Sequence, residues 1–169
     1  MDASHFVMGG VVGAFWSKVR LWVRTGSGRK RYNVLGSLNF ATKKIETVCN
    51  DTYITATQVI EMLELLATNY SNPIHIILDN ARYQKCKVVT EAALRLGITL
   101  EYLPSYSPNL NLIERVWKFV KSSVLSAAYI DTFEEYKLRI SNFVDTIEKE
   151  YPEKMESLVT ENFQLFDDC

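Results

Sequence analysis

Cysteine and histidine are scarce in this sequence, and their scarcity excludes several kinds of site. Among 169 residues there are three cysteines and two histidines, His5 and His75. Cys49, Cys86 and Cys169 are odd in number and have no paired spacing, so we expect reduced thiols and neither a disulfide framework nor a zinc site. Two histidines also exclude a histidine-rich metal centre.

Long hydrophobic runs are absent as well. No apolar stretch approaches the roughly 18 residues that cross a bilayer, and the N-terminal MDASHFVMGG lacks the basic and apolar regions of a signal peptide. We therefore expect a cytoplasmic protein with no membrane partner. The length of 169 residues suits one domain with a real core better than two domains.

The net charge is close to zero, but the charges are unevenly distributed. Residues 1–130 carry 15 Lys and Arg against 9 Asp and Glu, a net charge of +6. Residues 131–169 carry 4 against 11, a net charge of −7. This asymmetry indicates a body that faces a polyanion and an acidic C-terminal region. The charge pattern alone fits two ordinary solvated surfaces equally well.

The N-terminal part of the chain has the pattern of an antiparallel sheet. β-Branched and aromatic residues alternate with turn signals, which predicts consecutive strands joined by short turns. The expected strands are 5–13, 15–25, 31–40 and 45–50.

From residue 52 onward the hydrophobic period changes to that of helices separated by short strands. Thr55 and Gln58 form a capping box that starts the first helix, and Gly97 is placed to end the second. The expected order is a helix within 52–70, a strand at 74–78, a helix at 84–96, a strand at 98–103, a helix at 110–128 and a last helix from Asp131 or Thr132. A helical crossover makes the two strands parallel. We predict a mixed α/β, ribonuclease-H-like fold in a single domain, residues 1–169, whose residues 131–169 form an acidic helical region.

Three carboxylates are candidates for the chemistry. Asp79 ends the apolar strand IHIIL, Glu114 begins an amphipathic helix, and Asp2 is the only acid in the first 45 residues. In this fold the first strand lies beside the strand that ends at Asp79, so all three acids would meet at one end of the sheet. Such a cluster suits two Mg²⁺ or Mn²⁺ ions that activate a nucleophile for phosphoryl transfer.

Each acid taken alone also has a structural interpretation. Asp79 and Asn80 would begin a turn after a strand. Glu114 stands three residues after Asn111, where it would complete a capping box. Asp2 at the start of the chain would be an ordinary solvated residue. Only the joint placement of the three acids favours catalysis.

The residues around these acids resemble a known family. The blocks DASHFV, LDNARYQKCK and LPSYSPNLNLIERVWKFVK resemble the three acidic blocks of DDE transposases of the IS630/Tc1-mariner superfamily, and 34 residues separate Asp79 from Glu114. The resemblance implies that Asp2, Asp79 and Glu114 are a catalytic metal-binding triad. The sequence departs from the family pattern at Leu112, where proline is frequent, and at Gln84, where histidine is frequent.

The resemblance also implies features beyond the triad. Full-length members carry helix-turn-helix domains ahead of the first acid, so we interpret the chain as shortened, with part of the first strand missing. A homodimer is expected in the synaptic complex, and the protein would associate with the nucleoid when it acts. The expected DNA contacts fall in a basic turn, in the loop before Glu114 and along the helix that follows: Arg29, Lys30, Arg31, Tyr106, Arg115, Lys118 and Lys121.

The predicted activity is that of a cut-and-paste transposase. It comprises metal-dependent hydrolysis of a phosphodiester at the transposon end and strand transfer of the 3′-hydroxyl into target DNA. Two alternatives remain open at this point. One is a stand-alone ribonuclease-H-like nuclease without strand transfer, and the other is a catalytically silent remnant that binds DNA or dimerises.

Overall fold

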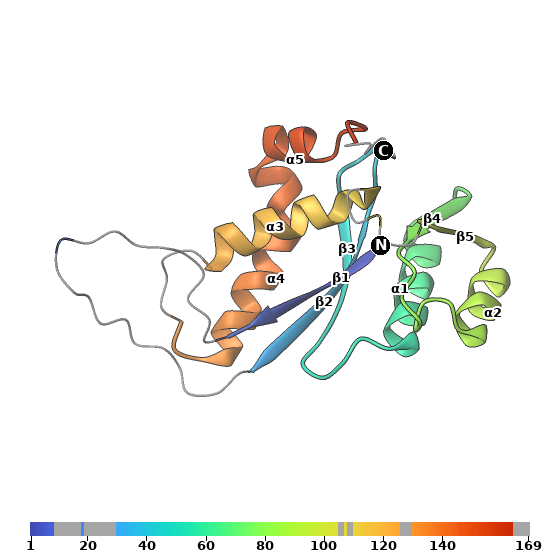
Figure 1. The fold of residues 1–169 in the computed structure, drawn as a ribbon, viewed down its shortest axis with the longest axis horizontal. Helices are drawn as coiled ribbons and strands as arrows, with labels where there is room; N and C mark the ends of the chain where they lie inside the picture. Colours follow the sequence, from blue (N-terminus) through green and yellow to red (C-terminus); the bar gives the residue numbers. More distant parts are fainter. Residues whose placement is uncertain (9–17, 19–29, 105–106, 108–109, 126–129, 164–169) are drawn as a thin grey trace, which may run out of the picture.

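The computed structural model describes residues 1–8, 18, 30–104, 107, 110–125 and 130–163. Five strands and five helices lie in these ranges (Figure 1). In chain order they are β1 (Asp2–Val7), β2 (Arg31–Leu38), β3 (Ile45–Asn50), α1 (Ala56–Asn69), β4 (Ile74–Leu78), α2 (Lys87–Arg95), β5 (Ile98–Tyr102), α3 (Leu112–Leu125), α4 (Phe133–Glu150) and α5 (Pro152–Leu158).

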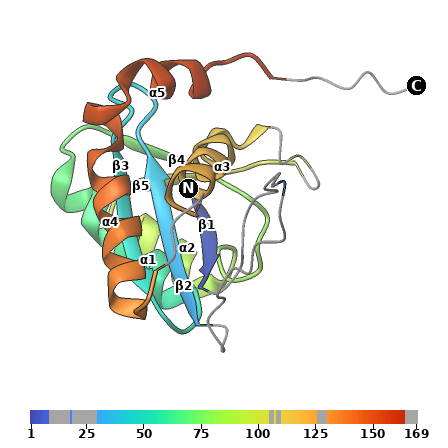
Figure 2. The same cartoon turned by 90° about the vertical axis from the view of Figure 1, so that its left-hand side faces the viewer.

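The three N-terminal strands form an antiparallel sheet in the order β1-β2-β3. In this register Asp2 lies opposite Gly36, and Leu35 lies opposite both Ala3 and Val48. Side chains of β2 alternate between two cores because successive residues of a strand face opposite sides. Tyr32 and Val34 pack against α3, α4 and α5, whereas Leu35 packs with α1 and the second sheet. The sheet therefore separates two hydrophobic cores, with helices on both sides (Figures 1 and 2).

The second sheet consists of β4 and β5, which are parallel and joined through α2. The prediction of a strand at 74–78 is confirmed. An apolar run of this kind is typical of a strand buried on both faces, but here only one face is buried. Ile77 is 54% exposed, because within the described residues only one face of this pair packs on helices. A hydrogen bond of 2.7 Å from the Met1 nitrogen to the Ile77 carbonyl joins the start of β1 to β4.

The helices follow the predicted apolar stripes closely. In α1 the buried residues are Val59, Met62, Leu63 and Leu66, and the capping box of Thr55 and Gln58 is present. The predicted stripe of α3 is buried throughout: Ile113, Val116, Trp117, Val120 and Val124. Thr132 caps α4 by accepting a hydrogen bond from the Glu135 amide. These matches confirm the mixed α/β fold class, with its antiparallel and parallel parts.

Several predicted boundaries need correction. The first strand begins at Asp2, not residue 5, because residues 2–7 all pair with β2. The helix expected from residue 84 begins at Lys87, after two turns and a fully buried Gln84. A separate helix, α5, starts at the Pro152 that ends α4, and it was not predicted.

The strand expected at 15–25 and residues 126–128 of the predicted helix lie outside the described residues. No helix in the described ranges is long and apolar enough to cross a membrane.

Gly36 permits a close contact between β2 and α3. A Cβ atom at this position would lie 2.5 Å from Cζ2 of Trp117 and 3.1 Å from Cδ1 of Ile113. Gly36→Ala should lower the free energy of unfolding by about 1–3 kcal/mol, measured by urea denaturation, because the indole has no room to move in a packed core. In a Trp117→Phe background the same change should be less destabilising. Equal losses in both backgrounds would contradict a direct clash with the indole.

Candidate functional site

Three separate elements carry the predicted acids. Asp2 is the first residue of β1 and is held by its pairing with Gly36 of β2. Asp79 directly follows β4, and Glu114 lies in the first turn of α3. The described structure thus delivers the three carboxylates from a strand start, a strand end and a helix start.

The charges of these carboxylates influence one another. Burial, together with the charges of Asp79 and Glu114, raises the pKa of Asp2 from 3.8 to about 6. Burial also raises the pKa of Glu114, as does the charge of Asp79, while the ammonium of Lys118 opposes the rise. The site is therefore a partly desolvated group of like charges, which is an arrangement a cation would stabilise.

The loop after Asp79 is tied to the ends of both parallel strands. Oδ1 of Asp79 accepts a hydrogen bond of 3.2 Å from the Ala81 amide, which closes the turn that its sequence also suggested. The Asn80 side chain donates to the Leu103 carbonyl, and the Leu103 amide donates to the Leu78 carbonyl at 2.8 Å. These bonds restrict the backbone on either side of Asp79, so turn formation and catalysis are compatible roles for this residue.

Glu114 is not held by a side-chain capping bond from Asn111 in the described structure. The Glu114 amide donates to the Asn111 backbone carbonyl at 3.1 Å, whereas the buried Asn111 amide nitrogen has no partner among the described residues. The Glu114 carboxylate lies in the first turn of α3, where the helix dipole favours negative charge.

Tyr83 belongs to the site although sequence reasoning did not identify it. Burial raises the pKa of its hydroxyl to about 12, and the charges of Asp79 and Asp2 contribute to the rise. The ring packs at the edge of the core around α1 and α2. In the sequence, only its position four residues after Asp79 pointed to the site. That spacing does not by itself predict that two residues of a loop lie close together.

The donor chemistry of the site fits hard divalent cations. Three carboxylates supply only oxygen ligands, the type that Mg²⁺ and Mn²⁺ prefer. Within the described ranges, no three His, Cys, Asp or Glu side chains are close enough together to hold a metal ion as they stand. The residues therefore match such an ion in the type of ligand atom and in charge.

The predicted DNA-contact residues have different surroundings. Lys30 and Arg31 are exposed where β2 begins, and Lys30 lies over the Phe133 ring. Arg115 donates to the carbonyls of Leu158, Thr160 and Asn162, so its guanidinium anchors the C-terminal segment.

Of the other predicted contacts, Lys118 is exposed on α3 and lies near Glu114. The Nζ of Lys121 lies 5.6 Å from the centroid of the Phe6 ring. Arg29 and Tyr106 lie outside the described residues. Contact of any of these side chains with DNA stays a prediction.

Comparisons with known proteins place this geometry in context. The chain resembles the Mos1 mariner transposase in its paired-end complex with Mn, with 15% identity and a TM-score of 0.65, over 98% of this chain and 55% of that one. It also resembles the catalytic core domain of BIV integrase, with 20% identity and a TM-score of 0.54, over 79% of this chain and 90% of that one. At these identities the likeness concerns the fold, which is that of ribonuclease-H-like transposase and integrase cores. The chain spans about half the length of the Mos1 transposase chain.

The family follows from a match to the sequence itself. Residues 1–137 match the model of the DDE superfamily endonucleases. The chain belongs to this family of DNA-processing enzymes, as the three acidic blocks had indicated. No curated protein matches the chain.

The raised pKa of Asp2 gives a prediction about stability. Because the pKa in the folded state, about 6, exceeds the ordinary 3.8, ionised Asp2 destabilises the fold above pH 6, and this effect disappears as the pH falls toward 4. Asp2→Asn should therefore raise the free energy of unfolding by roughly 2–3 kcal/mol at pH 7.5 in EDTA, and by little at pH 4.

Urea denaturation at the two pH values measures this effect. The exposed Asp51 offers a matched control, since Asp51→Asn should change stability little at either pH. An equal gain for Asp2→Asn at pH 7.5 and pH 4 would show that the ionisation of Asp2 is not its cause.

Proposed function

We propose that this chain is the catalytic domain of a DNA transposase of the IS630/Tc1-mariner kind. Its reaction is hydrolysis of a phosphodiester at a transposon end, followed by strand transfer of the resulting 3′-hydroxyl into target DNA. The observation that supports the proposal is that the charges of Asp2, Asp79 and Glu114, at the start of β1, just after β4 and in the first turn of α3, influence one another in a member of the DDE endonuclease family.

Asp2, Asp79 and Glu114 would hold two Mg²⁺ or Mn²⁺ ions. When bound, such ions supply activation of the attacking water or 3′-hydroxyl and neutralise charge on the leaving oxygen. The chain itself contributes position and charge. Hydrogen bonds around Asp79 fix its backbone, partial burial raises the pKa of Asp2, and Lys118 favours the ionised form of Glu114.

DNA is the partner in this proposal, both as transposon end and as target. The basic body of the chain, residues 1–130 with a net charge of +6, supports binding to a polyanion. Because two ends are joined to one target, we propose a homodimer as the working unit, acting on DNA in the cytoplasm at the nucleoid.

A catalytically silent domain is the second candidate, favoured by one observation. The described carboxylates are not close enough to one another for a metal site as they stand. If they cannot close around a cation, the chain would bind DNA or dimerise without cleaving. A stand-alone nuclease, the third possibility, would cleave without joining a 3′-hydroxyl to a second DNA.

Removing a carboxylate should abolish the chemistry without unfolding the protein. Asp79→Asn and Glu114→Gln should each lower nicking of supercoiled plasmid with Mg²⁺ or Mn²⁺ by at least about 100-fold, because each removes a metal ligand. Joining of a labelled oligonucleotide with a free 3′-hydroxyl to the plasmid should fall in parallel. Glu91→Gln, on the exposed face of α2, is the matched control and should retain wild-type rates. Wild-type nicking by Asp79→Asn would refute the assignment.

Metal binding can be measured separately from catalysis. Mn²⁺ should stabilise the wild-type fold, by about 2.7 kcal/mol at a concentration 100 times its Kd, because the folded chain alone assembles the three carboxylates. Thermal unfolding with and without Mn²⁺ measures this gain, which Asp79→Asn should remove. A folded wild-type protein whose unfolding is unaffected by millimolar Mn²⁺ would favour the silent domain.

A further inference from the structure

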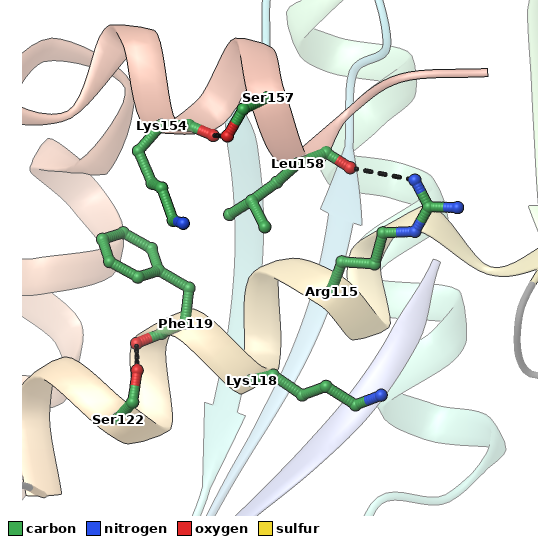
Figure 3. Close-up of a pocket in the computed structure, with 7 residues that line it drawn as sticks. All are labelled: Arg115, Lys118, Phe119, Ser122, Lys154, Ser157 and Leu158. Atoms are coloured by element: carbon green, nitrogen blue, oxygen red, sulfur yellow. Dashed lines mark hydrogen bonds between the residues drawn. The ribbon is translucent and has the colours of Figure 1, made fainter. Parts of the chain in front are cut away.

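A groove lies between α3 and α5, on the side of α3 that faces away from the three-stranded sheet (Figure 3). Its volume is about 400 Å³. On α3 it is lined by Arg115, Lys118, Phe119 and Ser122, whose spacing of three, four and seven residues places them on one face of the helix. On α5 it is lined by Lys154, Ser157 and Leu158, which share a face in the same way.

The charge of the groove is uniformly positive. Three of its seven lining residues are cations, two carry hydroxyl groups, and none is a carboxylate. Neither Lys118 nor Lys154 forms an ion pair within the described part of the chain. This is notable for Lys154, because residues 131–169 have a net charge of −7. The groove therefore concentrates positive charge where the acidic region meets the basic body.

Other contacts hold the two helices that line the groove. In these contacts neither lysine ammonium donates a hydrogen bond. Arg115 donates to the Leu158, Thr160 and Asn162 carbonyls at 3.4, 3.2 and 2.9 Å, which holds the end of α5 against α3. Phe119 packs edge-on against Phe143 and Tyr151. The Lys154 ammonium lies 5.7 Å from the Phe119 ring centroid, above an apolar floor, as Figure 3 shows.

The groove is continuous with the acidic site through α3. Lys118 lines the groove and also influences the pKa of Glu114, one helical turn earlier. Glu114 and Ser122 are eight residues apart, about 12 Å along the helix axis. A strand whose reacting phosphate lies at Glu114 would therefore bring a second phosphate, a few nucleotides away, to the groove.

We propose that the groove between α3 and α5 binds the phosphodiester backbone of DNA a few nucleotides from the reacting phosphate. Lys118 and Lys154 provide the charge, whereas the Ser122 and Ser157 hydroxyls donate to the Phe119 and Lys154 carbonyls, each at 2.8 Å. Contacts of this kind position a strand without reading its sequence. The inference rests on the proposed function for the identity of the DNA, but binding by the groove is measurable without cleavage.

Fluorescence anisotropy in EDTA, with a labelled 16-nucleotide single strand, tests binding directly. Lys154→Gln should weaken binding about fivefold or more and lower the slope of log K against log salt by about 0.7, the loss of one phosphate contact. Lys149→Gln, in the last turn of α4 and outside the groove, removes the same charge and should bind like wild type. Equal effects of the two variants, or none from Lys154→Gln, would overturn the proposal.

The position along the strand is tested by neutralising single phosphates. In the 3′-hydroxyl joining assay with single methylphosphonates placed at successive linkages, the methylphosphonate at the linkage that contacts Lys154 should lower the rate for wild type. It should have little further effect on Lys154→Gln, because the two changes remove the same contact. Additive effects at every linkage would overturn the proposed register. Failure of wild type to join DNA at all would refute the proposed function instead, while the anisotropy result would still decide whether the groove binds DNA.

Discussion

The indole of Trp117 packs directly on the backbone of β2 at Gly36, and the geometry of the acidic site depends on this contact. Gly36 is the register partner of Asp2, and Glu114 lies three residues before Trp117 on α3. The absence of a side chain at Gly36 thus sets how closely α3 approaches the strand that carries Asp2. A packing constraint in the core consequently controls the distance between two acids of different elements.

The acidic site itself opposes folding. Three carboxylates are held where burial and mutual repulsion raise the pKa of Asp2 to about 6. Such an arrangement persists only if the two cores on either side of the sheet stabilise it, and functional sites commonly store strain of this sort. The same repulsion provides affinity for a cation, so the instability and the proposed activity have one physical origin.

Helix α3 connects the parts of the molecule because its faces have different roles. One face buries five apolar residues against the sheet, its first turn presents Glu114, and another face lines the groove with Arg115, Lys118, Phe119 and Ser122. Arg115 shows how tertiary contacts reassign a residue. Its sequence position suggested a phosphate contact, whereas in the fold its guanidinium anchors the segment that follows α5.

Local patterns in the sequence determined most elements, the buried stripes of α1 and α3, and the acids of the site, since period, capping and strand ends are properties of neighbouring residues. Only the tertiary structure decided which distant groups meet. The proximity of Tyr83 to Asp79 and Asp2, the exposure of Ile77 and the groove between α3 and α5 all depend on how elements pack. Hydrophobic periodicity records which face of a helix is buried, but it does not record which surface covers that face.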